Sequence, residues 1–357
     1  MRMNSLQSVL ASSFLFATAI ACAQTSLPSA PTIAAKHGAE LKLWKTIESA
    51  STEDSVFELP INCDEAGNIY MKSGSDGFSV IHKYNPAGER TTSFAANTCP
   101  DVKVQVAGTF FVAPDGRVSQ VVFPPNEPQS SILLFEDDGS CHAKIKLDTQ
   151  FSFQPYQLAE FPSGAMLVSG LLWSPHDKAY LPYLGLFSAS GSLLKEVDLN
   201  DESSLEEPAK GITPVPLHRD NSKPDQSVTK GGMQLAADGK AYLMRSGSPA
   251  VVYAISQGGV VVRRFTIDPG DPGLTSREMH AAGNRIAVLF TDSRARRQLV
   301  KIVDLNGNPV NEYTHIFGGG QSAMFPTFAC YSLPGDKFTF LTTSKDNKLV
   351  IESAEPR

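Results

Sequence analysis

The sequence has little of what identifies most enzymes. Its seven histidines are scattered, and it contains no HExxH pattern and no CxxC pair, which are the spacings typical of zinc sites. It also has no GxSxG elbow to carry a serine nucleophile. We therefore expect neither structural zinc nor a recognisable nucleophilic site.

Charge is scarce as well. Charged residues make up 19% of the chain, the formal net charge is −6, and neither sign forms long blocks. Binding to nucleic acid needs a concentrated positive surface, because the phosphate backbone supplies most of the affinity. We expect no nucleic-acid partner.

Long hydrophobic runs are missing, apart from one near the start. Residues 9–21 are mostly apolar, which is too short for a membrane-spanning helix of roughly 20 residues. The run follows Arg2 and ends in Ala21-Cys22-Ala23, a small-residue cleavage pattern. We predict a signal peptide at residues 1–23 and a flexible linker at residues 24–37. The mature chain should then be periplasmic or extracellular, without a transmembrane segment.

Cysteine is rare, with five in the chain. Cys22 stands at the predicted cleavage site, where a lipid anchor is the alternative. Ala19 argues against that alternative, because lipoprotein signals usually carry Leu at this place. The remaining cysteines are Cys63, Cys99, Cys141 and Cys330. In an oxidising compartment they can form disulfides in any of three pairings, or they can remain buried thiols, and the sequence does not choose.

What the sequence does contain is a motif repeated six times. An apolar, β-rich segment leads into a turn with Gly or Asp, and a second apolar segment follows. The motif occurs at residues 64–70, 113–118, 161–166, 236–242, 281–286 and 333–338. A second turn rich in Gly, Asn or Asp follows in each repeat, and these residues tolerate the positive φ of tight hairpins.

Two hairpin turns per repeat predict four antiparallel strands. Repeats of about 40 to 50 residues with this content are typical of β-propeller blades. The sequence thus predicts an all-β fold, a single six-bladed β-propeller of four-stranded antiparallel blades over residues 38–357.

The last repeat is one strand short. It supplies strands near residues 327–332, 337–343 and 348–353, and then the chain ends. Residues 41–47 alternate apolar and polar side chains with the period of a half-buried strand. We predict that this N-terminal strand completes the last blade and closes the ring, which would remove an exposed sheet edge.

One interval between successive repeats is longer than the others. The excess is a polar stretch at residues 200–230, which predicts a long insertion between the third and fourth blades. Long loops on a rigid ring often carry function. We therefore consider His218, Arg219 and Asp220 as residues that fold over the ligand face, and a disordered insertion is the alternative.

The first repeat resembles the NHL-type repeats of six-bladed propellers, a group that also includes TolB-like propellers. The resemblance is carried by Asp64, Gly67, Asn68, Ile69 and Tyr70. In that family an Asp and an Asn-x-Arg loop usually follow, whereas this chain continues with Met71-Lys72-Ser73. The resemblance implies the propeller fold and no particular activity.

A propeller gathers its concave pockets around the central channel, on the face shared by the loops between second and third strands and the loops between blades. This mapping gives the candidate ligand-binding residues Trp173, His176, Asp177, Arg245, Arg294, Arg296 and Arg297. Trp173 would offer an aromatic surface, and His176 and Asp177 would orient polar groups. The alternative is a solvent-facing turn with Trp173 packed on its own loop.

The arginines suit a carboxylate or phosphate, because guanidinium groups bind such anions through two hydrogen bonds. A solvated loop tip is the alternative.

The absence of catalytic motifs favours an exported binding or scaffold module that holds a small molecule, a glycan or a protein on its loop face. The competing hypothesis is a lactonase-like hydrolase or lyase in the periplasm, with a divalent cation such as calcium in the channel. Asp177, Asp220 and Asp292 are then the candidate ligands of the cation.

Overall fold

The computed structural model describes residues 39–48, 56–74, 79–125, 127, 129–201, 203–206, 231–292, 297–316 and 326–357. Most of these residues lie in β-strands, which confirms the predicted all-β class. The predicted signal peptide, the linker, Cys22 and most of the insertion lie outside the described residues and remain predictions. Within the described part, no helix has the length and apolar character needed to cross a membrane.

Four sheets of four antiparallel strands follow one another along the chain. The first contains β2 (Phe57–Cys63), β3 (Ile69–Ser73), β4 (Val80–Tyr84) and β5 (Arg90–Ala95), followed by the short 3₁₀ helix η3 (Ala96–Thr98). The second contains β6 (Val106–Val112), β7 (Val118–Phe123), β8 (Ser131–Phe135) and β9 (Cys141–Lys146). The third contains β10 (Phe153–Glu160), β11 (Met166–Ser174), β12 (Ala179–Phe187) and β13 (Leu193–Glu196). The fourth contains β14 (Gly232–Leu235), β15 (Ala241–Arg245), β16 (Ala250–Ile255) and β17 (Val261–Ile267).

The remaining strands form one eight-stranded sheet in the order β18-β19-β20-β21-β1-β24-β23-β22. Its strands are β1 (Ala39–Glu48), β18 (Thr275–Ala282), β19 (Arg285–Asp292), β20 (Arg297–Asp304), β21 (Pro309–Ile316), β22 (Thr327–Ser332), β23 (Lys337–Thr343) and β24 (Leu349–Pro356). The predicted N-terminal strand is therefore present, and it pairs antiparallel with β24 along most of its length.

The prediction of six separate blades is met only in its coarser form, a propeller-like arrangement of sheets. The structure has four separate four-stranded sheets and one eight-stranded sheet. The reason is that β1 has two neighbours. Its first residues, Ala39 and Glu40, pair in parallel with Tyr313 and Thr314 of β21, so that the hydrogen-bonded ladder continues from β21 through β1 into β24.

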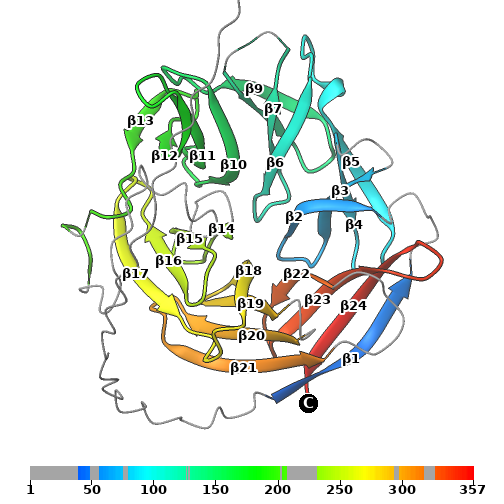
Figure 1. The fold of residues 1–357 in the computed structure, drawn as a ribbon. Helices are drawn as coiled ribbons and strands as arrows, with labels where there is room; N and C mark the ends of the chain where they lie inside the picture. Colours follow the sequence, from blue (N-terminus) through cyan, green and yellow to red (C-terminus); the bar gives the residue numbers. More distant parts are fainter. Residues whose placement is uncertain are drawn as a thin grey trace, which may run out of the picture. The chain divides into compact units, whose positions relative to one another are not determined.

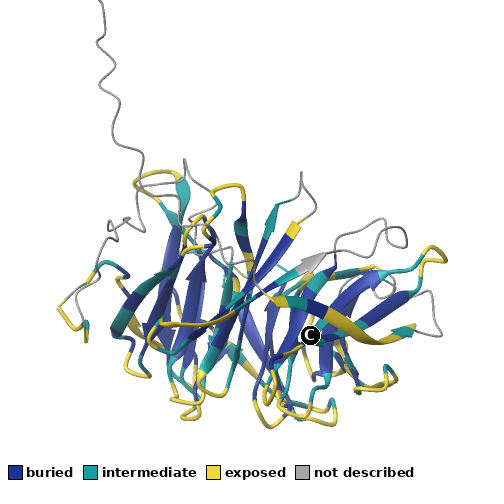
Figure 2. Ribbon diagram, turned by 90° about the horizontal axis from the view of Figure 1, so that it is seen from below, coloured by how far each residue is buried: buried dark blue, intermediate teal, exposed yellow. Residues whose placement is uncertain are grey.

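The first strand of each repeat lies nearest the common centre, as Figure 1 shows for β2, β6, β10, β14, β18 and β22. Each of these inner strands contacts the next, and β22 contacts β2, so that they form a closed ring. Buried residues run along the strands, while exposed residues gather in the turns (Figure 2). Neighbouring sheets pack through aromatic side chains, such as Phe94 of β5 against Phe135 of β8, with ring centroids 6.0 Å apart.

Two disulfides connect the first sheet to both of its neighbours. Cys63 of β2 is bonded to Cys330 of β22, with Cα atoms 5.8 Å apart, and Cys99 is bonded to Cys141 of β9, with Cα atoms 5.2 Å apart. The fold thus selects one of the three pairings that the sequence left open. Disulfides of this kind persist in oxidising compartments, which is compatible with the predicted export.

Aspartates secure the turns that end the inner strands. Asp64 accepts a hydrogen bond from Tyr70 Oη at 3.0 Å, and Asp238 accepts one from Tyr242 Oη at 3.0 Å. Asp336 is the most buried of the three turn aspartates, with 3% of its surface exposed.

The Asp336 carboxylate accepts hydrogen bonds from four side chains: Tyr331 (2.7 Å), Tyr313 (2.6 Å), Asn311 (2.5 Å) and Arg285 (2.8 Å). Burial alone would raise the pKa of Asp336, but these hydrogen bonds and the Arg285 charge hold it below its ordinary value.

Candidate functional site

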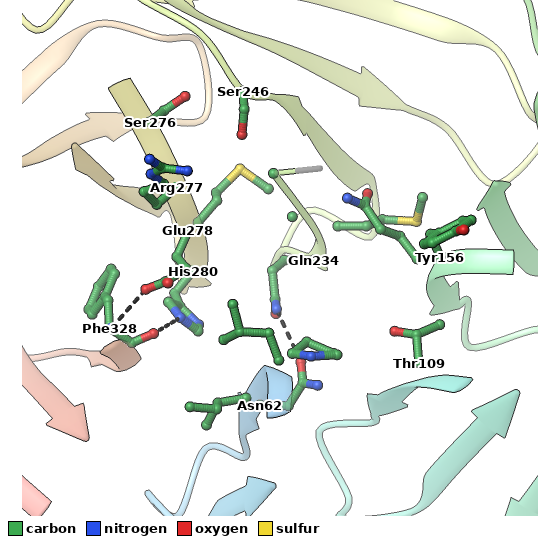
Figure 3. Close-up of a pocket in the computed structure, with 18 of the residues that line it drawn as sticks. Asn62, Thr109, Tyr156, Gln234, Ser246, Ser276, Arg277, Glu278, His280 and Phe328 are labelled. Carbon is green, nitrogen blue, oxygen red and sulfur yellow. Dashed lines mark hydrogen bonds between the residues drawn. The ribbon is translucent and has the colours of Figure 1, made fainter. Parts of the chain in front are cut away.

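A cavity of about 350 Å³ lies at the centre of the ring, and all six inner strands contribute to its wall (Figure 3). Its polar side chains include Asn62, Thr109, Gln234, Glu278 and His280. Concave, mostly apolar cavities with a few converging polar groups are the usual sites for small ligands. This cavity is therefore the candidate functional site.

Most inner strands are bulged where they face the cavity. In the described structure, the register with the second strand shifts between Glu58 and Asn62, Ala107 and Phe110, Pro155 and Gln157, Ser276 and Glu278, and Phe328 and Cys330. The β14–β15 pair is regular. A bulge leaves an extra residue without a cross-strand partner and redirects its side chain. Leu59, Thr109, Tyr156 and Arg277 all lie in such shifts, and all four line the cavity.

Two side chains of β18 hold the neighbouring inner strand β22 through the backbone of Phe328. Glu278 accepts the backbone N–H of Phe328 at 2.7 Å, and His280 Nε2 lies 3.0 Å from the Phe328 carbonyl oxygen, to which it donates (Figure 3). Burial raises the pKa of Glu278 to about 7 and lowers the pKa of His280 to about 4. At neutral pH the imidazole is therefore uncharged, and Glu278 is close to its titration midpoint.

An amide pair spans the channel. Gln234 Nε2 of β14 donates to Asn62 Oδ1 of β2 at 3.3 Å, although the two residues are 172 positions apart in the chain (Figure 3). Asn62 Nδ2 also donates to the Phe110 carbonyl oxygen at 3.3 Å. Both amides stand one residue before their strands end. The cavity extends from this pair toward the strand starts, where Gly231 and Thr275 line it.

A second hollow of about 500 Å³ adjoins the first and shares Leu59, Pro60, Thr109 and Tyr156 with it. Apolar side chains stand open at its edge, with Leu59 53%, Val106 54% and Tyr156 43% exposed. The buried Lys72 ammonium in its wall lies 2.6 Å from Glu58 Oε2 and 3.0 Å from the Gly108 carbonyl oxygen. Lys72 thus connects the first sheet to the second.

The predicted cluster lies at the end of β11 and in the turn to β12. Trp173 is half-buried and packs edge-on against Tyr180, with ring centroids 5.2 Å apart. The His176 side chain is 96% exposed, and Asp177 accepts a hydrogen bond from Ser174 Oγ at 2.6 Å. Trp173, His176 and Asp177 are all described, and none of them lines either hollow. A ligand role for them remains a prediction.

The predicted arginines are dispersed. Arg245 is buried at the end of β15, next to Ser246, which lines the cavity. Arg297 begins β20 and forms ion pairs with Asp271 at 2.8 Å and Asp292 at 3.1 Å. Arg294 and Arg296 lie outside the described residues, as do His218, Arg219 and Asp220 of the insertion.

A metal site has no support in the described part of the chain, where no three His, Cys, Asp or Glu side chains are grouped closely enough to hold an ion. The hypothesis of a calcium ion in the channel therefore rests on the sequence alone.

The residues of the cavity were not predicted from the sequence, because the predicted ligand residues were taken from the loops and the cavity is lined mainly by the inner strands. A signal was present. Pro60, Gly108 and Pro155 interrupt segments that otherwise predict strands. Proline and glycine inside strands mark bulges and close approaches. Pro60 and Gly108 lie within observed register shifts, and Pro155 borders one.

No family model matches the chain, and no curated protein matches it. Among solved structures, a protein of unknown function from Dyadobacter fermentans is similar with a TM-score of 0.51 at 10% identity, covering 89% of this chain and 99% of that one. A protein of unknown function from Bacteroides caccae has a TM-score of 0.45 at 15% identity, covering 71% and 80%. The WD40 domain of Neurospora crassa Pan2 has a TM-score of 0.43 at 9% identity, covering 90% and 97%. At 10% identity, the similarity to the Dyadobacter fermentans protein shows a likeness of fold alone.

Proposed function

We propose that this protein is an exported binding module, a six-bladed β-propeller that holds a small ligand in its central cavity and does not transform it. The observation that carries the proposal is the set of strand bulges. Irregularities in separate sheets bring Leu59, Thr109, Tyr156 and Arg277 to one cavity. Bulges concentrate beside functional sites, where they redirect side chains.

The eight-stranded sheet counts as two blades in this proposal. One blade is β18 to β21, and the other is β22 to β24 completed by β1. Each group carries one copy of the repeated turn motif, and each contributes one inner strand to the ring. The parallel contact that joins them involves only two residue pairs, those of Ala39 and Glu40.

Binding is favoured over catalysis because the polar groups of the cavity are already held in place. His280 uses its Nε2 hydrogen to hold the Phe328 carbonyl, and Asn62 and Gln234 hold each other. Side chains fixed in this way lose little entropy when a ligand binds, which is how preorganised sites gain affinity.

The test compares two aromatic residues, one that lines the cavity and one that does not. The exported protein is screened by thermal shift with single amino acids, maltose, glycyl-leucine and γ-butyrolactone, because a ligand that binds only the folded state raises the melting temperature. The same screen is applied to Tyr156→Ala, inside the cavity, and to Trp173→Ala, outside it.

We expect at least one compound to raise the melting temperature of the wild type and of Trp173→Ala, but not that of Tyr156→Ala. The reverse pattern would move the site to the β11–β12 turn. Hydrolysis of the lactone would overturn the conclusion that the ligand is not transformed.

A further inference from the structure

We propose that the central cavity takes a free α-amino acid with an apolar side chain, with its ammonium group at Glu278 and its carboxylate at Arg277. This inference rests on the proposed function, ligand binding in the cavity, and adds the chemical class of the ligand.

The bulge in β18 is the basis of this pairing. Successive residues of a regular strand point to opposite faces, so Arg277 and Glu278 would normally be separated by the sheet. The register shift between Ser276 and Glu278 leaves Arg277 without a cross-strand partner, and both side chains line the cavity. Figure 3 shows the two on one side of the cavity, with Tyr156 on the other. A cation and an anion therefore stand side by side on one wall.

Neither charge is neutralised by an ion pair within the described structure. Arg277 is exposed, and its Nε donates to Thr291 Oγ1 at 3.3 Å. The hydrogen bond to Glu278 comes from the neutral backbone N–H of Phe328 and reaches Oε2. The guanidinium terminus and the second carboxylate oxygen are therefore positioned to receive a ligand.

An α-amino acid matches this wall because it carries an ammonium and a carboxylate on one carbon. Guanidinium binds carboxylate through two parallel hydrogen bonds. Charge-assisted hydrogen bonds of this kind are stronger than those that neutral ligand groups form. A simple amine would meet the repulsion of Arg277, and a simple acid that of Glu278. Leu158, Met233 and Met279 line the rest of the cavity and suit an apolar side chain.

Binding should depend on the protonation of Glu278. The other titratable side chains in the cavity wall are Tyr156, Arg277 and His280. Burial raises the pKa of Glu278 to about 7, a backbone hydrogen bond and the Arg277 charge act in the opposite direction, and His280 stays neutral above pH 6. The carboxylate form binds ammonium, so affinity should increase about tenfold between pH 6 and pH 8.

The experiment is calorimetric titration of the exported protein with L-leucine and L-phenylalanine, alongside phenethylamine and 3-phenylpropanoate, which each lack one charged group. We expect both analogues to bind at least about tenfold more weakly than L-phenylalanine. Arg277→Gln should weaken the binding of L-phenylalanine but not that of phenethylamine. Glu278→Gln should weaken the binding of L-phenylalanine but not that of 3-phenylpropanoate. Glu278→Gln should also abolish the pH dependence.

Arg117→Gln is the matched control, because this exposed arginine pairs with Asp115 outside the cavity and its loss should leave the affinity unchanged. Thermal unfolding of each variant verifies that it is folded. Equal affinity for amino acid and analogues, or no effect of either cavity variant, would overturn the inference.

The two proposals fail differently. If maltose or glycyl-leucine binds in a Tyr156-dependent way and amino acids do not, the ligand class is wrong and the binding function stands. If no compound binds in a Tyr156-dependent way, both proposals fall.

Discussion

The pKa of a buried carboxyl group is shifted in opposite directions at the turn end of the inner strands and in the cavity. At the turn end, Asp336 receives hydrogen bonds from four side chains, including the charged Arg285, and its pKa lies below the ordinary value. In the cavity, Glu278 receives one backbone N–H, and burial raises its pKa to about 7. The number of donors decides the sign of the shift. The hydrogen bonds at the turn end stabilise the ring, whereas the Glu278 carboxylate in the cavity has fewer hydrogen-bond donors than Asp336.

Removal of the disulfide that closes the ring should give the largest effect. Cys63 and Cys330 are separated by 267 residues, and Cys99 and Cys141 by 42. A longer closed loop restricts the unfolded chain more strongly, so the Cys63→Ser/Cys330→Ser variant should lose about 4 to 5 kcal/mol of unfolding free energy.

The Cys99→Ser/Cys141→Ser variant is the control and should lose about 1 to 2 kcal/mol less. Denaturant unfolding of the two double variants measures the difference. An equal loss in the two variants would show that the disulfide between the first and last sheets stabilises the ring no more than the other disulfide does.

Asp336→Asn should follow in size. The amide keeps the shape and tolerates the positive φ of 51° at this position, but it removes the charge that faces Arg285 and replaces an acceptor by a donor. We expect a loss of about 3 kcal/mol in unfolding free energy, because breaking an enclosed ion pair leaves its partner unpaired. Denaturant unfolding provides the measurement.

Asp346→Asn, in an exposed turn of the same sheet, is the matched change and should alter stability by less than about 0.5 kcal/mol. Similar losses in the two variants would remove the distinction between a structural carboxylate and an ordinary turn residue.

Glu278→Gln should change the pH dependence of stability more than its magnitude. The pKa of Glu278 is higher in the folded protein than in the unfolded chain, so its favourable contribution is complete below pH 4.5 and is lost as pH rises through about 7. The variant should therefore gain stability relative to the wild type between pH 5 and pH 8. His280 contributes equally to both proteins and cancels in the comparison.

Melting temperatures of the two proteins across this pH range provide the check. Parallel curves would show that Glu278 is solvated like a surface carboxylate, and the contrast with Asp336 would disappear.

The parts of the fold that could be predicted from sequence depend on neighbouring residues. Gly116 and Gly164 have φ values of 87° and 78° at the expected turns, because only a residue without a Cβ adopts this conformation readily. The strand at residues 41–47 was evident from its alternation, and it pairs with β24 as predicted. The continuation of its first residues onto β21 was not evident, because it depends on where two distant sheet edges meet.

None of the described ligand residues that the sequence predicted lines the cavity, and their own ligand role stays a prediction. Trp173, His176 and Asp177 form the densest group of binding-type residues along the chain, yet the fold leaves them outside both hollows. The cavity is assembled from single residues of separate strands, so no cluster of binding-type residues in the sequence points to it.

The sequence by itself determined the all-β class, the repeat, the turns and the strand that returns to the end of the chain, because turn chemistry and strand periodicity act over a few residues. Only the tertiary structure decided the cysteine pairing, the amide pair formed by Asn62 and Gln234 across 172 residues, and the placement of Arg277 and Glu278 on one wall of the cavity. These features depend on ring closure and on strand register, and a shift of one residue in register exchanges the side chains that face the channel.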